Sequence, residues 1–326
     1  MVLSEPMCGL SNFFRWRDAG NGSPACLVRL VEQPEVDDAL RLLLGSGGHR
    51  GDDHAARDFV RFAHHRNLDL GSMHVAVSGN KLLASSLAIL SPGKTALLMT
   101  STAGTVTAIA DAIAGCVQAT CDGFNRTQTH LAQLLLEPAE VTTAAAMRRV
   151  GFADLATLIY LQRPVIRTFV MPTLPNNTEL VTYSEMTHHL FGRAILASYD
   201  ESLDCPPLHG RREVDDILAG HKSAGEFSPD LWFCLVRDGA PLGVLLLSPS
   251  RSHGTMELVY VGLSVAARGQ RIGDYFLALA LHHAHAQSLG HLTLAVDAAN
   301  VPALRLYHRH GLAEVHRRDA MLMELA

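Results

Sequence analysis

The chain has 326 residues, of which 48% are hydrophobic and 18% charged, with Lys+Arg 27 against Asp+Glu 32 and a net charge of −5. This length suits two domains better than one core, and the composition is that of a globular protein rather than a disordered one. The slightly acidic balance excludes an overall basic field, so nucleic acid is not an expected partner.

The first half of the chain alternates strand and helix patterns. After a lead-in over residues 1–24, the predicted elements are a strand at Cys26–Val31, helices at Glu35–Leu44 and Ala55–His65, a hairpin of Met73–Val77 and Leu82–Leu90, a strand at Thr95–Thr100, a helix at Val106–Cys121, a strand at Leu131–Glu137, a helix at Glu140–Val150 and a strand at Asp154–Gln162. The run Gly45–Gly51 lacks the Gly-Lys-Ser/Thr of a phosphate loop, so we interpret it as a linker between helices.

Prolines and asparagines at residues 165–178 predict a linker between two domains, 25–164 and 179–326. In the second domain the pattern predicts helices at Phe191–Tyr199 and Glu213–Leu218, separated by the loop Cys205–Gly210. A hairpin of Leu231–Val236 and Pro241–Leu247 follows.

The next segment combines a strand, a basic loop and a helix. Met256–Leu263 is β-branched, aromatic and apolar, which predicts a buried strand, and apolar residues recur at helical spacing from Ile272. Such a junction directs backbone N–H groups and the positive end of a helix dipole to one place, where a pyrophosphate or similar anion can bind. Gly269 and Gly273 allow a ligand to approach the backbone closely, while the loop arginines add positive charge.

The loop Arg268-Gly269-Gln270-Arg271-Ile272-Gly273 resembles the acetyl-coenzyme A signature Q/R-x-x-G-x-G/A of the GNAT acetyltransferases. Arg271 stands where the middle glycine is expected. Asp274 is a second departure, because an acid suits the helix dipole but repels a phosphate. The resemblance implies that acetyl-CoA, as co-substrate, contacts Leu263, Ser264, Val265, Arg268, Gly269, Gln270, Arg271, Ile272, Gly273 and Asp274.

A second motif follows the predicted strand His291–Asp297. Asn300, Ala303, Leu306, Tyr307 and Gly311 match the GNAT pattern N-x-x-A-x-x-L-Y-x-x-x-G-F, with a leucine in place of the phenylalanine. Proline near the start of this helix and Gly311 at its end agree with helix capping preferences. By the resemblance, Asn300 helps to hold the coenzyme. A last strand is expected at Met321–Leu325.

Overlaying the two halves with a shift near 160 residues suggests an internal duplication. The segment Ser101–Thr105 then falls on the anion loop but has no arginine, Glu140 falls on Asn300 and Met147 on Tyr307. We therefore predict an α/β (α+β) fold of two tandem GNAT-like domains, each a mixed, mostly antiparallel sheet flanked by helices. The first domain is expected to be degenerate.

Acetyl transfer to an amine requires a proton acceptor for the amine and a proton donor for the departing thiolate. The resemblance assigns the donor role to Tyr307, although a buried tyrosine packed in the core is the structural alternative. Glu257 is the candidate base, directly or through water, because even spacing places it on the same strand face as Leu263 if no bulge intervenes. Its strand is similar to one in mycothiol synthases, a tandem branch of the family. Backbone N–H groups of Leu263–Val265 are expected to polarise the thioester carbonyl, and the loop Cys205–Gly210 to lie near the acceptor pocket.

Eighteen histidines and six cysteines show no metal-ligand spacing, so no metal is expected, and the cysteines are expected to be reduced. No signal peptide and no apolar run of about 20 residues is recognised, so we expect a cytoplasmic protein without membrane contact. The predicted function is transfer of acetyl from acetyl-CoA to the amine of a small molecule by the C-terminal domain. The alternatives are a non-catalytic coenzyme-binding or regulatory protein and a mycothiol-synthase-like enzyme. The acceptor's identity and the oligomeric state are left open.

Overall fold

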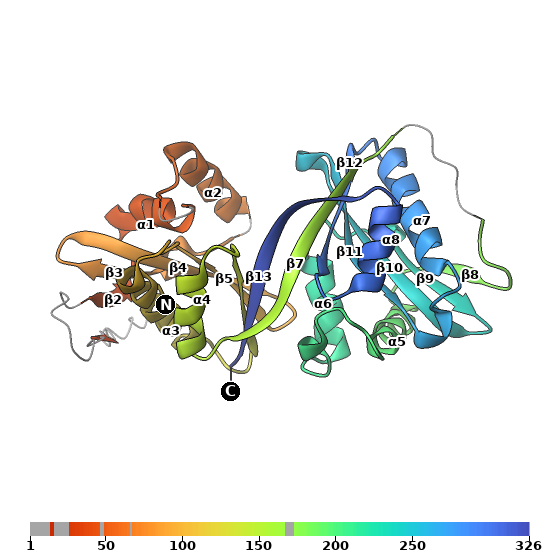
Figure 1. Ribbon diagram of the computed structural model, residues 1–326, viewed down its shortest axis with the longest axis horizontal. Coiled ribbons are helices and arrows are strands. Elements are labelled where there is room, and N and C mark those ends of the chain that lie inside the picture. Colours follow the sequence, from red (N-terminus) through yellow and green to blue (C-terminus); the bar gives the residue numbers. More distant parts are fainter. Residues whose placement is uncertain (1–13, 16–25, 46–48, 66, 167–172, 326) are drawn as a thin grey trace, which may run out of the picture. The chain divides into compact units, whose positions relative to one another are not determined.

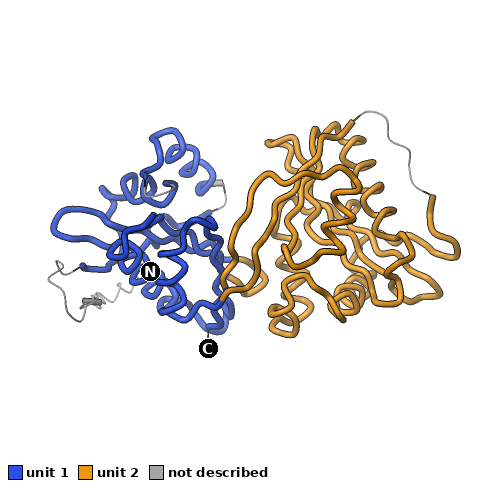
Figure 2. The backbone as a smooth tube through the Cα atoms, in the orientation of Figure 1, with its two compact units in different colours: residues 1–90, 96–153, 322–326 blue, residues 91–95, 154–321 orange. Residues whose placement is uncertain are grey.

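The computed structural model describes residues 14–15, 26–45, 49–65, 67–166 and 173–325. Most of the lead-in over residues 1–24, all but Phe14 and Arg15, and part of the expected linker at residues 165–178 lie outside these ranges. The described chain forms two compact units (Figures 1 and 2). Unit 1 contains residues 1–90, 96–153 and 322–326, and unit 2 contains residues 91–95 and 154–321.

Unit 1 has a sheet in the order β1-β2-β3-β4-β5-β6. Leu40, Met73, Val75 and Leu87 are fully buried in the core that α1 and α2 form with the sheet. The elements are β1 (Phe14–Arg15), β2 (Leu27–Leu30), α1 (Val36–Leu43), α2 (Asp53–His65), β3 (His74–Ser78), β4 (Lys81–Ser91), β5 (Thr95–Thr100), α3 (Thr107–Asp122), β6 (Leu131–Leu136) and α4 (Val141–Arg149).

Unit 2 has a sheet in the order β13-β7-β12-β11-β10-β9-β8. The elements are β7 (Ala153–Pro164), β8 (Glu179–Thr182), α5 (His188–Tyr199), α6 (Val214–Ser223), β9 (Trp232–Arg237), β10 (Ala240–Ser250), β11 (Thr255–Leu263), α7 (Ile272–Ala286), β12 (His291–Asp297), α8 (Val301–Arg309) and β13 (Ala313–Glu324). Short 3₁₀ turns occur at Gln33–Glu35, Leu70–Ser72, Pro206–Leu208, Pro229–Leu231, Arg251–His253 and Val265–Ala267.

The same order of elements occurs twice along the chain. The series β2-α1-α2-β3-β4-β5-α3-β6-α4-β7 is repeated as β8-α5-α6-β9-β10-β11-α7-β12-α8-β13. The compact units do not coincide with these copies, because β7 pairs with β12 through Leu158–Pro164 and nearly all of it belongs to unit 2. The sequence analysis assigns this strand, as Asp154–Gln162, to the first domain, 25–164. It also missed β8 and assigned only the last part of β13.

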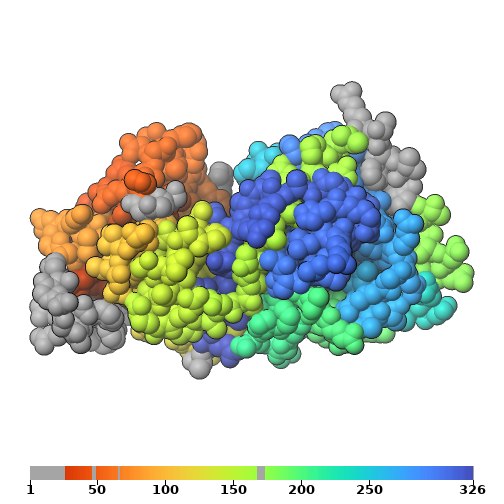
Figure 3. All heavy atoms as spheres, in the orientation of Figure 1, coloured from red at the N-terminus to blue at the C-terminus, as the bar shows by residue number. Residues whose placement is uncertain are grey.

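Helices cover both faces of the unit 2 sheet. Phe276 and Leu277 of α7 pack with Tyr307 of α8 on one face, whereas Phe191 of α5 and Ile217 of α6 pack on the other. Most of α8 is exposed at the surface, and the space-filling view shows it on the outside of this unit (Figure 3). Within the described residues, none of the helices combines the length and apolarity needed to span a bilayer.

The strands β11 and β12 position the site because they run parallel for only a short distance. Their pairing is Thr255 with His291, Met256 with Leu292 and Glu257 with Thr293. Beyond these pairs β11 continues to Leu263, but it is no longer paired with β12. Since unpaired neighbouring strands leave a gap in a sheet, this is where a ligand can reach between them.

Candidate active site

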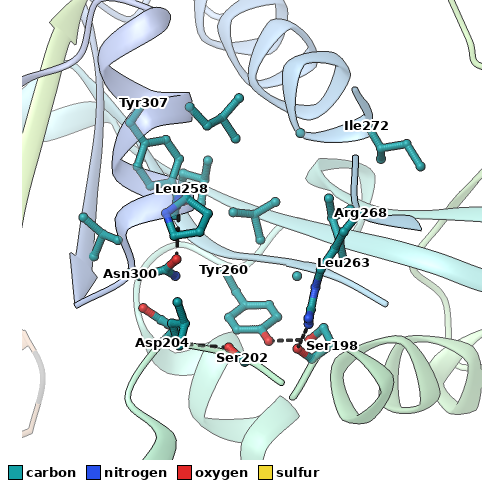
Figure 4. Close-up of a pocket in the computed structure, with 18 of the residues that line it drawn as sticks. Ser198, Ser202, Asp204, Leu258, Tyr260, Leu263, Arg268, Ile272, Asn300 and Tyr307 are labelled. Carbon is teal, nitrogen blue, oxygen red and sulfur yellow. Dashed lines mark hydrogen bonds between the residues drawn. The ribbon is translucent and has the colours of Figure 1, made fainter. Parts of the chain in front are cut away.

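A cavity of about 450 Å³ lies where β11 and β12 separate. This volume is in the range typical of small-molecule sites. Its wall is formed by Leu258–Leu263 of β11, the end of β12, the first turns of α7 and α8, and the loop that follows α5. Figure 4 draws Tyr307, Asn300 and Asp204 on one side of the cavity, and Arg268 and Ile272 on the other.

Most of the sequence-predicted coenzyme residues line this cavity. They are Leu263, Arg268, Gly269, Arg271, Ile272, Gly273, Asp274 and Asn300. Three predicted residues of the loop do not line it: Ser264, Val265 and Gln270. The backbone N–H and the hydroxyl of Ser264 both donate to the carbonyl of Leu242, at 2.9 and 3.2 Å. The N–H of Ser264 is therefore already used and is not available to polarise a thioester.

The first turn of α7 faces the cavity with unpaired donors. The first hydrogen bond of the helix is donated by the N–H of Tyr275 to the carbonyl of Arg271, and no side chain caps the N-terminus. The preceding N–H groups, those of Ile272, Gly273 and Asp274, have no partner within the helix, as is general for a first turn. Because these donors coincide with the positive end of a 15-residue helix, the turn favours an anionic ligand group.

Arg268 lines the cavity, and its guanidinium is also engaged by backbone carbonyls. Its guanidinium donates to the carbonyls of Asp200 at 2.6 Å, Ser198 at 3.2 Å and Glu201 at 3.3 Å. These carbonyls belong to the C-terminal end of α5 and the residues just beyond it. Arg268 therefore caps that helix and holds the following loop against the cavity.

Arg271 explains why the family signature has a glycine at its position. The residue has φ 61, in the left-handed region, and its side chain is 86% exposed. A side chain in this conformation costs roughly 1–2 kcal/mol, a cost that glycine avoids. The arginine is tolerated because it points outward, so the backbone follows the course that the signature requires.

We expect Arg271→Gly to raise the midpoint of thermal unfolding by about 2 °C, because it removes this backbone strain. The exposed contact of Arg271 with Asp274, at 3.7 Å, contributes little that would be lost. Differential scanning calorimetry of the full chain measures the shift. Gly269→Ala is the matched control, because Gly269 has φ 77 and no atom lies within 4 Å of an added Cβ. That control should lower the midpoint, and a lower midpoint for Arg271→Gly would contradict the assignment.

The negative charge of Asp274 is paired with residues at the C-terminal end of α8. Its carboxylate accepts from Nε2 of His310 at 2.7 Å and from the guanidinium of Arg309 at 2.9 Å. Partial burial alone would raise the pKa of Asp274, but these two hydrogen bonds hold it below its usual value. The carboxylate thus ties the start of α7 to the end of α8, which answers the objection that it would repel a phosphate.

Tyr307 and Asn300 lie on α8 at the opposite side of the cavity. Tyr307 is 4% exposed, and burial, followed by the charge of Asp204, raises the pKa of its hydroxyl above the usual value. It therefore stays protonated throughout the neutral range. The side-chain oxygen of Asn300 accepts from the N–H of Ala303 at 3.3 Å and caps α8, while the same side chain lies near Asp204 and acts to lower the pKa of its carboxyl.

Glu257 does not share a face with Leu263, because a bulge intervenes. Leu246 of β10 pairs with Tyr260 and Leu247 pairs with Leu258, so Val259 is an extra residue. Leu258 and Leu263 therefore both face the α7 side, and Glu257 faces the other. It is exposed and does not line the cavity, although desolvation by the surrounding protein still raises the pKa of its carboxyl.

The structure adds three residues that the sequence did not single out. Ser198, at the end of α5, hydrogen-bonds the hydroxyl of Tyr260 at 2.6 Å, and both line the cavity with Asp204. The loop Cys205–Gly210, which was expected near the acceptor pocket, begins immediately after Asp204. Its position was the sequence signal that could have pointed to Asp204. Among the described residues no group of three or more His, Cys, Asp or Glu side chains is placed to hold a metal.

Comparison with known proteins identifies the fold around this cavity. Residues 196–312 match the acetyltransferase (GNAT) family. A mycothiol acetyltransferase of Acidothermus cellulolyticus is 30% identical over 189 residues, which is 53% of this chain and 56% of that protein. The chain thus spans about half the length of the curated relatives that it matches.

Two solved structures resemble nearly the whole chain. A GCN5-related N-acetyltransferase from Sphaerobacter thermophilus has a TM-score of 0.60 at 16% identity and covers 92% of this chain and 96% of its own. A tandem GNAT protein from the clavulanic acid biosynthesis pathway has a TM-score of 0.52 at 14% identity and covers 92% of this chain and 99% of its own. At these identities the likeness concerns the fold, and it confirms the predicted tandem GNAT architecture.

Proposed function

We propose that this chain, whose residues 196–312 form a domain of the acetyltransferase (GNAT) family, transfers acetyl from acetyl-CoA to the amine of a small molecule. The observation that carries the proposal is the cavity between β11 and β12. It has the free N–H groups of the first turn of α7 on one wall and the protonated hydroxyl of Tyr307 on the other. An anion site and a proton donor thus lie on opposite walls of one cavity.

The residues present fit the coenzyme. The first turn of α7 would bind its pyrophosphate, and Gly269 would let it approach the backbone, since no atom lies within 4 Å of where its Cβ would be. The open stretch of β11 beyond Glu257 offers backbone groups to the extended part of the molecule. The coenzyme supplies the thioester, and the protein supplies its position and the proton donor.

Tyr307 would act on the sulfur. Because its pKa lies above the usual value, it acts by hydrogen bonding to the sulfur while the carbon–sulfur bond breaks, and not by losing its proton beforehand. Two carboxyl groups are candidates to receive the proton of the amine. Sequence pointed to Glu257, which would have to act from the exposed face of β11, and the structure adds Asp204 in the cavity wall.

We also propose that unit 1 has no coenzyme site. Glu140 is 4% exposed, and its carboxylate accepts from the N–H of Ala103 at 3.2 Å and from the hydroxyl of Thr143 at 2.7 Å. Ala103 lies in the loop between β5 and α3, the counterpart of the loop before α7. The carboxylate of Glu140 thus occupies the N–H of Ala103, a donor that a coenzyme phosphate would otherwise need. This supports a single coenzyme site, in unit 2.

The proposal is tested by incubating the full chain with acetyl-CoA and a panel of primary amines. Free thiol is followed with a thiol-reactive dye, and mass spectrometry identifies the acetylated amine. We expect release of one thiol per amide formed. Binding of acetyl-CoA without turnover on any amine would contradict the proposal and favour the non-catalytic, regulatory alternative.

A second candidate is a mycothiol-acetyltransferase-like activity. The observation that favours it is the 30% identity with the relative that carries this name. The same assay with a cysteinyl pseudo-disaccharide as acceptor tests it. Acetylation of that compound in strong preference to simple amines would identify this branch of the family, and absence of preference would exclude it.

A further inference from the structure

We propose that Asp204 is the catalytic base of unit 2: it receives the proton of the acceptor amine as the nitrogen attacks the thioester. This inference rests on the proposed acetyl transfer and adds a residue that no family signature contains. Asp204 lies in the loop after α5, and it lines the same cavity as Tyr307.

The cavity opens toward both faces of the sheet. Leu258 and Tyr307 in its wall belong to the core on the α7 side, whereas Tyr260 packs against the core on the α5 side. The anion-binding turn of α7 belongs to the first face, and the loop carrying Asp204 follows α5 on the second face. A coenzyme bound at the first turn of α7 occupies the α7 side of the cavity. The acceptor then binds on the α5 side, next to Asp204.

The backbone and two side chains hold Asp204 in place. Its carboxylate accepts from the N–H of Asp297 at 3.3 Å, while the carboxylate of Asp297 accepts from the N–H of Cys205 at 3.1 Å. This reciprocal pair links the loop to the end of β12. The side chain of Asn300 at the start of α8 lies near the carboxylate, and Cys205 adopts φ 45, a strained conformation that the pair maintains. These contacts hold the carboxylate of Asp204 in a defined position at the cavity wall.

The surroundings of Asp204 make its carboxylate a stronger base than that of an ordinary aspartate. Burial, opposed by the hydrogen bond from Asp297 and reinforced by its charge, raises the pKa of Asp204 above that of an ordinary aspartate. The titratable groups that face it are Asp297 on β12, Cys205 and His209 in its own loop, Tyr199 on α5, Tyr260 on β11 and Tyr307 on α8. No lysine or arginine is among them; His209 is the group that can carry a positive charge, and it lowers the pKa of Asp204 less than burial raises it.

The proposed step balances without a further reactant. The nitrogen lone pair forms the bond to the acetyl carbon, and the carbon–sulfur bond breaks with its electron pair going to sulfur. The proton lost by nitrogen moves to Asp204, and the sulfur receives the proton of the Tyr307 hydroxyl. Asp204 and Tyr307 then return to their starting states by exchange with solvent. The acceptor class that this arrangement favours is a small primary amine in its neutral form, whose N–H group can donate to the carboxylate.

The test is the pH dependence of kcat at a saturating concentration of the best amine from the panel. Under saturation kcat reports groups in the complex rather than the ionisation of free amine. We expect Asp204→Asn to lower kcat about 100-fold and to abolish the fall of kcat on the acid side. The asparagine keeps an oxygen for the N–H of Asp297, so the fold is expected to survive. Asp204→Glu should recover part of the rate and the acid limb.

Two control variants, Glu213→Gln and Glu257→Gln, are compared with Asp204→Asn. Glu213→Gln, in the same loop but exposed, should match the parent protein. Glu257→Gln should retain the acid limb, and loss of that limb in this variant instead of in Asp204→Asn would overturn our inference. An Asp204→Asn profile parallel to that of the parent would also overturn it. If the parent protein acetylates no amine, the proposed function is contradicted. Carbon-13 NMR of the aspartate carboxyls then tests the basicity of Asp204 separately: a signal that titrates above the usual aspartate range must vanish in Asp204→Asn.

Discussion

Replacing Tyr307 by phenylalanine should lower kcat by about 100-fold or more and leave the affinity for acetyl-CoA nearly unchanged. The ring of Tyr307 fills the core between α7, α8 and the sheet, and phenylalanine preserves that packing. The hydroxyl is the group that faces the sulfur in the proposed mechanism, so its loss removes a hydrogen bond made chiefly in the transition state.

The comparison for this substitution is Tyr275→Phe. Tyr275 is a buried tyrosine of α7, 6% exposed, that does not line the cavity. It should leave kcat within about twofold of the parent protein. Steady-state kinetics with the best amine of the panel, together with calorimetric titration of acetyl-CoA, separates turnover from binding. A Tyr307→Phe protein with the kcat of the parent would remove the tyrosine from the mechanism.

Replacing Gly273 by glutamate should weaken acetyl-CoA binding at least tenfold, or by more than about 1.4 kcal/mol. A Cβ at this position meets Cδ2 of Leu306 at 2.7 Å, so the leucine must move at the wall of the cavity. The added carboxylate also lies in the turn whose N–H groups attract the anionic ligand, and there it repels phosphate. A glutamate in the first turn of a helix suits the dipole, so the fold is expected to persist.

Gly273→Gln is the matched variant, because it has the same size without the charge. Calorimetric titration at low and high salt measures both contributions. The glutamate variant should bind more weakly than the glutamine variant at low salt, and the difference should shrink as salt screens the charge. Equal affinities for all three proteins would show that the first turn of α7 does not bind the coenzyme.

The sequence contained enough information to predict the fold and the two segments, before α7 and at the start of α8, that line the cavity. The two signatures place a loop before α7 and the start of α8, and both lie on local patterns that a linear sequence displays. Helix ends were predictable for the same reason: the prediction of Val106–Cys121 compares with α3 at Thr107–Asp122. The left-handed backbone of Arg271, with φ 61, accounts for the glycine that the family signature has at this position.

The acceptor half of the site could not be predicted, because it depends on contacts between distant segments. Asp204 reaches the cavity through pairing with Asp297, and nothing in its own loop announces that contact. The position of Glu257 was misjudged relative to Leu263 because a single extra residue, Val259, reverses the alternation of a strand. The capping of α5 by Arg268 could not be predicted either, because Ser198 lies 70 residues away in sequence.

Calorimetric titration of the full chain with acetyl-CoA tests the central claim most directly, because it needs no knowledge of the acceptor. We predict one binding site per chain, located in unit 2 and weakened by Gly273→Glu. Two sites would contradict the closure of the unit 1 loop by Glu140, and no binding at all would leave the chain with the tandem GNAT fold but without the coenzyme site that we propose.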